Sequence, residues 1–280
     1  MAINTNKLKT FAQNSRDILI EGVSQRIAFW GFNNNGEVVE EPQKVQGGIL
    51  HRGKIYDNPG WYEMYSRLKY AIRKKGVVQV AEEAAYTWFN RIMAIRILSK
   101  NRYIQPQVEF GEGGVTPLIL QYARRGQVNF LNNNEKERLN AIITDYQKEN
   151  EAFAILLICF CNNNTLLKNI FGTLDDFSEL LLPANILAEN GFVHLLNKTD
   201  AITDEDYRQV ELIGWLYQFY ISKKKDEVFK KFKNNKKAEK EDIPAATQIF
   251  TPNWIVKYMV QNTVGQIWLD LHPLSPLKEK

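Results

Sequence analysis

The residues with the clearest potential for chemistry lie in the stretch ATQIFTPNWIVKYMV, at 246–260. Pro252 suits the first turn of a helix, because it has no N–H group to leave unpaired and its φ angle is already close to helical. Thr251 can act as the N-cap residue. Its hydroxyl and the free N–H groups of such a helix form a site that suits a carboxylate or a phosphate. The stretch predicts an extended run at 248–250 and a helix over 252–268.

A second candidate is the Lys-rich segment 223–240. Its nine Lys against Asp226, Glu227 and Glu239 sum to +6, two more than the +4 of the whole chain, so the rest is slightly acidic. On one hypothesis this segment binds DNA phosphates and loses affinity steeply with salt. On the other it is a connector, and the interleaved Phe229 and Phe232 favour one that packs. The DNA hypothesis assigns phosphate contacts to Lys223, Lys224, Lys225, Lys230, Lys231, Lys233, Lys236 and Lys237.

Other side chains with chemical potential favour a structural interpretation. The aromatic run GWLYQFY at 214–220 could stack on bases, but helical spacing is more typical of core. Arg91 and Arg96 could face DNA, and we favour structural pairing. Cys159 and Cys161 lie two residues apart in an apolar run, which indicates buried, reduced thiols. The three histidines are scattered, so we expect no metal site.

Three short motifs imitate functional sites. Thr116–Pro117 is most simply a helix start. DNPGW at 57–61 predicts a turn before a helix, and FGEGGV at 110–115 lacks the G-x-G-x-x-G spacing and predicts a loop.

The elements that position these residues are mainly helices. In 77–100, apolar residues recur every three or four positions, which indicates one buried stripe. That stripe consists of Val80, Ala84, Trp88, Ile92 and Ile95. Helices are also predicted at 3–21 and 133–161, with several short ones in 164–196. The run RIAFWGFNNNGEVVE at 26–40 predicts a small β-hairpin, and 41–60 reads as a loop.

The segment 203–221 has the most complete helix signals. Thr203 is the predicted N-cap, and the acidic residues after it complement the positive end of the helix dipole. The predicted inner stripe is Val210, Ile213, Tyr217 and Tyr220.

Composition predicts a soluble globular protein. The longest apolar run, at 153–161, is nine residues long, far short of the roughly 20 needed to span a bilayer. The N-terminus shows no apolar signal region. We therefore expect a cytoplasmic protein without membrane contact.

The pattern Q-x-F-T-P-x-x-I-V-x-Y-M-V at 248–260 resembles the motif that precedes the cofactor loop in amino-methylating DNA methyltransferases. The blocks at 82–96, 210–222 and 243–260 follow in an order similar to the N-terminal region of the adenine-specific methyltransferases of BREX phage-defence systems, the PglX type. The resemblance implies an S-adenosylmethionine cofactor whose methionine part lies against Phe250, Thr251 and Pro252. It also implies double-stranded DNA and other defence-system proteins as partners of the full-length protein.

The family's cofactor loop, D-P-A-x-G-S-G, and its catalytic N-P-P-Y do not occur in this sequence. We therefore expect no catalytic residue in the chain, no Rossmann-like core, no bound cofactor and no activity alone. The predicted domains are a helical module at 1–222, a Lys-rich connector at 223–244 and the truncated start of a methyltransferase domain at 245–280. Without its catalytic sheet, the last helix should expose apolar side chains and promote self-association. These are Trp254, Ile255, Met259 and Trp268. The alternatives are a self-contained helical interaction protein and a basic DNA-binding module.

Overall fold

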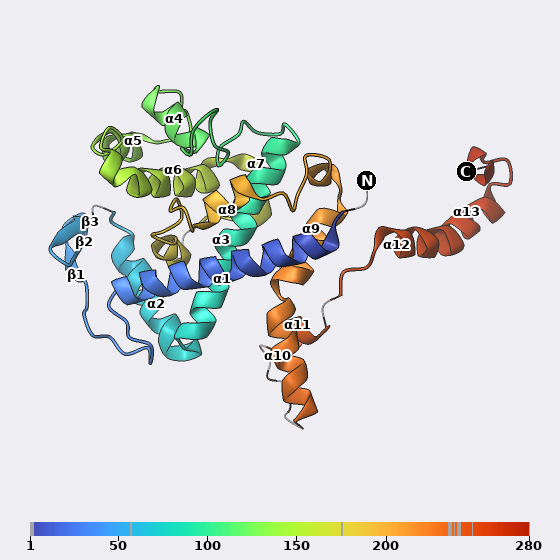
Figure 1. The fold of residues 1–280 in the computed structure, drawn as a ribbon, viewed down its shortest axis with the longest axis horizontal. Coiled ribbons are helices and arrows are strands. Elements are labelled where there is room, and N and C mark those ends of the chain that lie inside the picture. The colour runs from blue at the N-terminus through green and yellow to red at the C-terminus, as the bar shows by residue number, and fades with distance from the viewer. Residues whose placement is uncertain are drawn as a thin grey trace. The chain divides into compact units, whose positions relative to one another are not determined.

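The computed structural model describes residues 3–56, 58–174, 176–234, 237, 239, 242–247 and 249–279. Helices dominate these residues (Figure 1), which confirms the predicted mainly α class with a small antiparallel sheet. The chain divides into two compact units, one of Asn14–Arg208 and one that joins Met1–Gln13 to Gln209–Lys280. The predicted domain boundaries stay predictions.

Helix α1 begins in the smaller unit and ends in the larger one. The elements up to the end of the larger unit are α1 (Thr5–Phe29), β1 (Gln43–Val45), β2 (Gly48–His51), β3 (Lys54–Tyr56), α2 (Trp61–Lys75), α3 (Val77–Lys100), α4 (Leu118–Arg124), α5 (Asn133–Asn140), η1 (Tyr146–Lys148), α6 (Glu149–Asn163), α7 (Thr165–Phe171), η2 (Phe177–Leu181), α8 (Phe192–Lys198) and η3 (Asp206–Arg208).

The described residues in the rest of the smaller unit are mainly helical. Its elements are α9 (Glu211–Tyr220), α10 (Ser222–Lys233), α11 (Ile243–Thr247), α12 (Asn253–Val260), the π-helical turn η5 (Gln261–Gly265), α13 (Gln266–Leu271) and η6 (Pro276–Glu279).

Helix α3 is the central core element of the larger unit. The predicted stripe is confirmed, since each of its five residues is at most 1% exposed. The Trp88 indole N–H donates to the Ser178 carbonyl at 3.0 Å, which satisfies the one polar atom that this side chain brings into the core. The stripe therefore also connects α3 to η2, through the hydrogen bond from Trp88 to Ser178.

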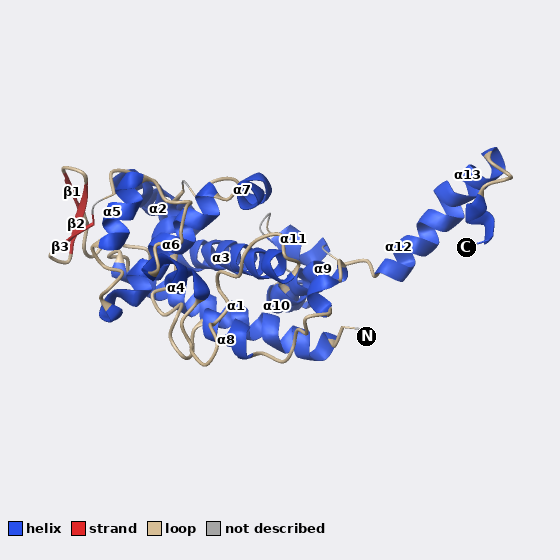
Figure 2. Ribbon diagram, turned by 90° about the horizontal axis from the view of Figure 1, so that it is seen from above, coloured by secondary structure: helices blue, strands red, loops and turns tan. Residues whose placement is uncertain are grey.

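The predicted hairpin at 26–40 is wrong in position. Helix α1 continues to Phe29, and only an isolated bridge joins Phe32 to Val38. The sheet lies instead in the predicted loop, where β2 pairs antiparallel with both β1 and β3, and Figure 2 shows it as the one small sheet of the described residues. Arg52 and Gly53, at φ 51° and 73°, form a two-residue turn of the kind that closes hairpins. Gly47 and Gly53 are turn residues of the sheet, so two glycines of the predicted loop connect its strands.

Two predicted helices are divided. The segment 133–161 contains α5, a turn, η1 and α6, because Asp145 accepts a hydrogen bond from the Gln147 N–H and starts a new helical segment. In 203–221, the Thr203 hydroxyl donates to the Asp206 carboxylate and accepts from the Asp206 N–H. Thr203 therefore caps the short helix η3 and not one long helix.

The inner stripe predicted for 203–221 is wrong at Val210 and Ile213 and confirmed at Tyr220, while Tyr217 is half-buried. Val210 and Ile213 are 89% and 59% exposed, and the buried face of α9 is Leu212, Leu216 and Tyr220. This stripe also obeys helical spacing, so periodicity alone did not distinguish the two registers.

The structural interpretation of the two arginines is confirmed. Arg91 is buried and donates to the carbonyls of Phe171 and Gly172 at 3.3 and 3.4 Å, at the end of α7. Arg96 is buried beside Glu109, with 3.3 Å between Nη1 and Oε1, and also donates to Asn197 at 3.2 Å.

The two cysteines are buried and unpaired, as predicted. Burial raises the pKa of the Cys161 thiol to about 12 and raises the pKa of Cys159 as well. Since the thiolate is the reactive form, both side chains are inert at neutral pH.

The three motifs that imitate functional sites form a turn, a loop and a helix start, as predicted. Asn58 and Gly60 form a turn before α2, the segment 110–115 is a loop, and Thr116–Pro117 precedes α4. Asp57 lies outside the described residues. No single described helix is long and apolar enough to cross a membrane; the pair Tyr146–Asn163 and Thr165–Phe171 meets that test only across a 78° bend.

Glu179 makes the stability of the larger unit depend on pH. It is 9% exposed and accepts a hydrogen bond from the Trp61 indole at 2.7 Å, and burial raises its pKa. Between the unfolded and the raised folded pKa the native state holds more protons than the unfolded state, so this contribution falls as pH rises. Glu179→Gln keeps the acceptor without the charge. We expect equal free energies of unfolding for the two proteins near pH 4 and a more stable variant at pH 8, measured by urea denaturation; a variant less stable at pH 8 would contradict this.

Candidate functional site: the Phe250–Asn253 segment on helix α9

The Phe250 ring packs directly on the backbone of α9. A Cβ atom added to Gly214 would lie 2.0 Å from two ring carbons of Phe250, so only glycine leaves room for the ring. The ring also makes an edge contact with Trp215, with 5.1 Å between centroids. Gly214 is therefore a close-approach position rather than a flexible one.

Two hydrogen bonds hold the backbone on either side of Thr251. The Phe250 N–H donates to Gln218 Oε1 at 2.9 Å, and the Asn253 N–H donates to Glu211 Oε1 at 2.7 Å. The Glu211 carboxylate thus sits at the N-terminus of α12, where the helix dipole favours negative charge.

These contacts come from one face of α9. Glu211, Gly214, Trp215 and Gln218 are spaced i, i+3, i+4 and i+7, so they line one side of the helix. The buried face with Leu212 and Leu216 points elsewhere. We call the four residues the α9 face. Our sequence reasoning missed it; the signal was a glycine and two polar residues at helical spacing in an otherwise apolar helix.

The prediction that the aromatic run 214–220 is core is confirmed in part. Leu216 and Tyr220 are buried, and the half-buried Trp215 stacks on Phe219 with 5.4 Å between ring centroids. Trp215 also contacts Phe250 and so belongs to the α9 face.

The predicted helix is confirmed, but its N-cap residue is not the predicted Thr251. Pro252 is the N-cap residue, at φ −55° and ψ 145°, and its own side chain makes no cap hydrogen bond. Pro117 begins α4 with nearly the same angles, −56° and 141°. The two Thr–Pro sequences start helices in the same way, and only the later one is held by the α9 face. Of the extended run predicted before this helix, Gln248 lies outside the described residues.

The helical run after Pro252 exposes apolar side chains. It continues through α12, η5 and α13 to Leu271. Trp254, Met259 and Trp268 are 70%, 58% and 48% exposed, and Ile255 is half-buried. The exposure of Trp254, Met259 and Trp268 is as expected from the sequence, and Ile255 is less exposed than expected. Self-association stays a prediction.

The Lys-rich segment forms a packed helix in its first part. In α10, Val228 is buried, and the helix packs on α9 and α11. Lys231 pairs with the buried Asp242 at 2.9 Å, which lowers the pKa of Asp242 and raises the pKa of Lys231. The predicted phosphate contacts differ in environment: Lys223, Lys224 and Lys225 are half-exposed, Lys230, Lys233 and Lys237 are exposed, and Lys236 lies outside the described residues. Their role with DNA stays a prediction.

Phe250, Thr251 and Pro252 lie together before α12, and their contact with a cofactor stays a prediction. Thr251 is exposed and precedes a helix N-terminus, which fits a ligand carboxylate, while the Phe250 ring serves as an anchor on α9. An incoming carboxylate would meet Glu211, which already accepts from the Asn253 N–H. Among the described residues, no group of three or more His, Cys, Asp or Glu could hold a metal ion.

Comparison with known proteins identifies relatives along almost the whole chain. No family model matches it. The adenine-specific methyltransferase BrxX of Escherichia coli O9:H4 (strain HS) is 35% identical over 285 residues, which is 99% of this chain and 23% of the relative. The adenine-specific methyltransferase PglX of Lacticaseibacillus casei (strain Zhang) is 32% identical over 285 residues, covering 94% of this chain and 23% of the relative. This chain is homologous to a part of the PglX-type adenine-specific methyltransferases.

The resemblance predicted from the sequence motifs is therefore confirmed. The chain spans about a quarter of the length of these PglX-type relatives, as expected for an N-terminal region. The α9 face and the Phe250–Asn253 segment both lie within the matched part.

Proposed function

We propose that the chain is the N-terminal part of an S-adenosylmethionine-dependent adenine N6-methyltransferase of a BREX phage-defence system. The homology to BrxX and PglX supports this assignment. In this proposal the helical region braces the catalytic domain and fixes its entrance segment, and the chain alone is inactive. The observation that carries this role is the attachment of Phe250–Asn253 to the α9 face by ring packing and two backbone hydrogen bonds.

Each residue of the segment has a separate part in the proposal. Phe250 anchors the segment in the space above Gly214, and Pro252 turns the backbone into α12. Thr251 is left exposed between two fixed points, where its hydroxyl can orient the methionine end of the cofactor. The bound cofactor would supply the methyl group. The residues of this chain would orient it and hold the first helix of the catalytic domain in place.

Methylation of DNA tests the proposal. The full-length protein that contains this sequence should produce N6-methyladenine in double-stranded DNA when S-adenosylmethionine is present, measured by mass spectrometry of nucleosides. The 280-residue chain, at the same concentration, should produce none. Methylation by the chain alone would contradict the proposed division of labour, and no methylation by the full-length protein would contradict the enzyme assignment.

A further inference from the structure

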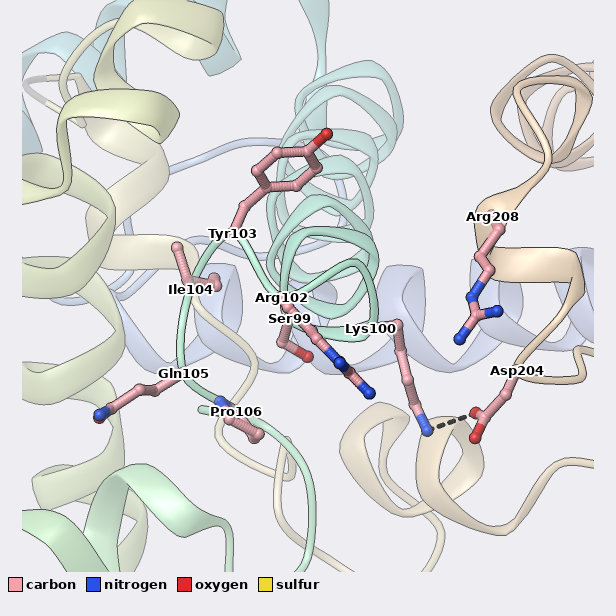
Figure 3. A pocket seen from close by; sticks show the side chains of 9 residues that line it. All are labelled: Ser99, Lys100, Arg102, Tyr103, Ile104, Gln105, Pro106, Asp204 and Arg208. Atoms are coloured by element: carbon pink, nitrogen blue, oxygen red, sulfur yellow. Dashed lines mark hydrogen bonds and ion pairs between the residues drawn. The ribbon is translucent and has the colours of Figure 1, made fainter.

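A basic hollow lies in the larger unit and shares no residue with the α9 face or with α10. It has a volume of about 660 Å³ and lies between the C-terminal end of α3 and the segment around η3. Figure 3 shows the side-chain ends of Lys100, Arg102 and Arg208 directed toward the same space. Asp204 pairs with Lys100. The hollow therefore has three cationic side chains against one carboxylate.

Arg102 has a left-handed backbone conformation that glycine usually takes. Helix α3 ends in a Schellman motif, in which the Tyr103 N–H donates to the Leu98 carbonyl and the Arg102 N–H to the Ser99 carbonyl, both at 2.9 Å. Arg102 occupies the left-handed position of this motif, at φ 63°. Glycine is the residue that takes this conformation without strain.

Glycine takes the left-handed position after three other helices. Gly76, Gly126 and Gly172 follow α2, α4 and α7 with φ of 84°, 68° and 70°. At α3 the chain accepts a strained conformation and keeps a guanidinium at the rim of the hollow. A residue that costs stability in this way is typical of a functional site.

The two sides of the hollow are fixed to each other. The Asn101 side chain donates to the Tyr207 carbonyl at 2.8 Å and to the Ile97 carbonyl at 2.9 Å. This pair of bonds ties η3 to the last turn of α3, so the backbone segments that carry Arg102 and Arg208 are held together without a ligand. Such preorganisation reduces the entropy lost on binding an anion.

We propose that this hollow binds the phosphodiester backbone of double-stranded DNA through Arg102 and Arg208. Guanidinium groups suit phosphate because they donate two parallel hydrogen bonds to it. Tyr103, which is 71% exposed, also lines the hollow, with its hydroxyl directed away from the three cations (Figure 3). The choice of DNA rests on the proposed function. Contacts of this type hold DNA in place without reading its sequence.

The variant Arg102→Gly distinguishes a loss of DNA binding from a loss of stability. The variant removes the cation and also the left-handed strain, so we expect a melting temperature raised by about 2 °C together with an affinity for a labelled DNA duplex lowered about tenfold. The slope of log K against log salt should become shallower by about 1. Arg208→Gln should weaken binding without the rise in melting temperature. Fluorescence anisotropy at several salt concentrations gives both binding quantities.

Arg52→Gly is the matched control. Arg52 is the other described non-glycine residue at positive φ, at 51°, and it is a partly exposed cation that pairs with Glu40 at 3.1 Å. The Arg52→Gly variant should also be more stable than the wild type and should keep wild-type DNA affinity. Wild-type affinity in Arg102→Gly, equal losses in both variants, or no binding of DNA by the wild-type chain would overturn the inference. So would binding of polyglutamate that requires Arg102 when binding of DNA does not.

The DNA-binding test of the hollow and the methylation test of the proposed function can fail independently. Loss of DNA affinity in Arg102→Gly, with no methylation by the full-length protein, would support the hollow and contradict the enzyme assignment. Unchanged DNA affinity, with methylation by the full-length protein, would contradict the hollow alone.

Discussion

Gly214→Val is expected to release the Phe250–Asn253 segment from α9 while the rest of the chain stays folded. The new side chain would collide with the Phe250 ring, because a Cβ atom at position 214 would lie only 2.0 Å from that ring. Valine is a slightly better helix former than glycine, so α9 itself is not weakened. Overpacking costs about 1–3 kcal/mol, and a cost of about 2 kcal/mol makes amide exchange at Phe250 ~30-fold faster. Hydrogen exchange of that amide, whose partner is Gln218, measures the effect directly.

Two further variants separate this release from general damage. Gly60→Ala is the matched glycine control, because an added Cβ there meets only the side chains of Asn58 and Met64 at 3.7 and 3.8 Å. Adding Phe250→Ala to Gly214→Val removes the collision and should slow exchange at residue 250 again relative to the single variant. Unchanged exchange at Phe250 in Gly214→Val would contradict the docking role of α9. In the proposed full-length enzyme, the same substitution should weaken S-adenosylmethionine binding.

Arg96→Met is expected to destabilise the chain by about 3 kcal/mol. It leaves the Glu109 carboxylate largely buried, at 13% side-chain exposure, without its cation. Glu109 also accepts hydrogen bonds from the Ser99 hydroxyl and the Gln107 N–H, so it cannot turn to solvent without breaking these. Urea denaturation followed by circular dichroism measures the change in the free energy of unfolding.

The double variant Arg96→Met with Glu109→Gln should recover part of that loss, because a neutral amide no longer needs a cation. Lys75→Met is the control for an exposed ion pair: Lys75 and Glu83 are 2.7 Å apart but 38% and 40% exposed, and the expected cost is about 0.5 kcal/mol. Equal costs for Arg96→Met and Lys75→Met would show that Arg96 is not a structural cation and would reopen its assignment to DNA.

The sequence by itself determined the class of the fold and the ends of several elements. The α3 stripe was readable because apolar residues at helical spacing must face one way. Thr251–Pro252 was readable as a helix start because the fixed φ and the missing N–H of proline are local properties of that residue and do not depend on the rest of the fold. The order of the motif blocks was enough to indicate the methyltransferase relatives found by comparison.

Only the tertiary structure decided which surfaces meet. Leu212 and Ile213 are equally apolar neighbours, and the choice of the buried one depends on what packs against α9. The α9 face pairs Gly214 with Phe250 and Glu211 with Asn253, residues 36 and 42 positions apart. The basic hollow joins the end of α3 to η3, about a hundred residues along the chain. Local propensities act over a few residues, whereas these contacts arise from the packing of whole helices, and a single sequence carries no direct signal of that packing.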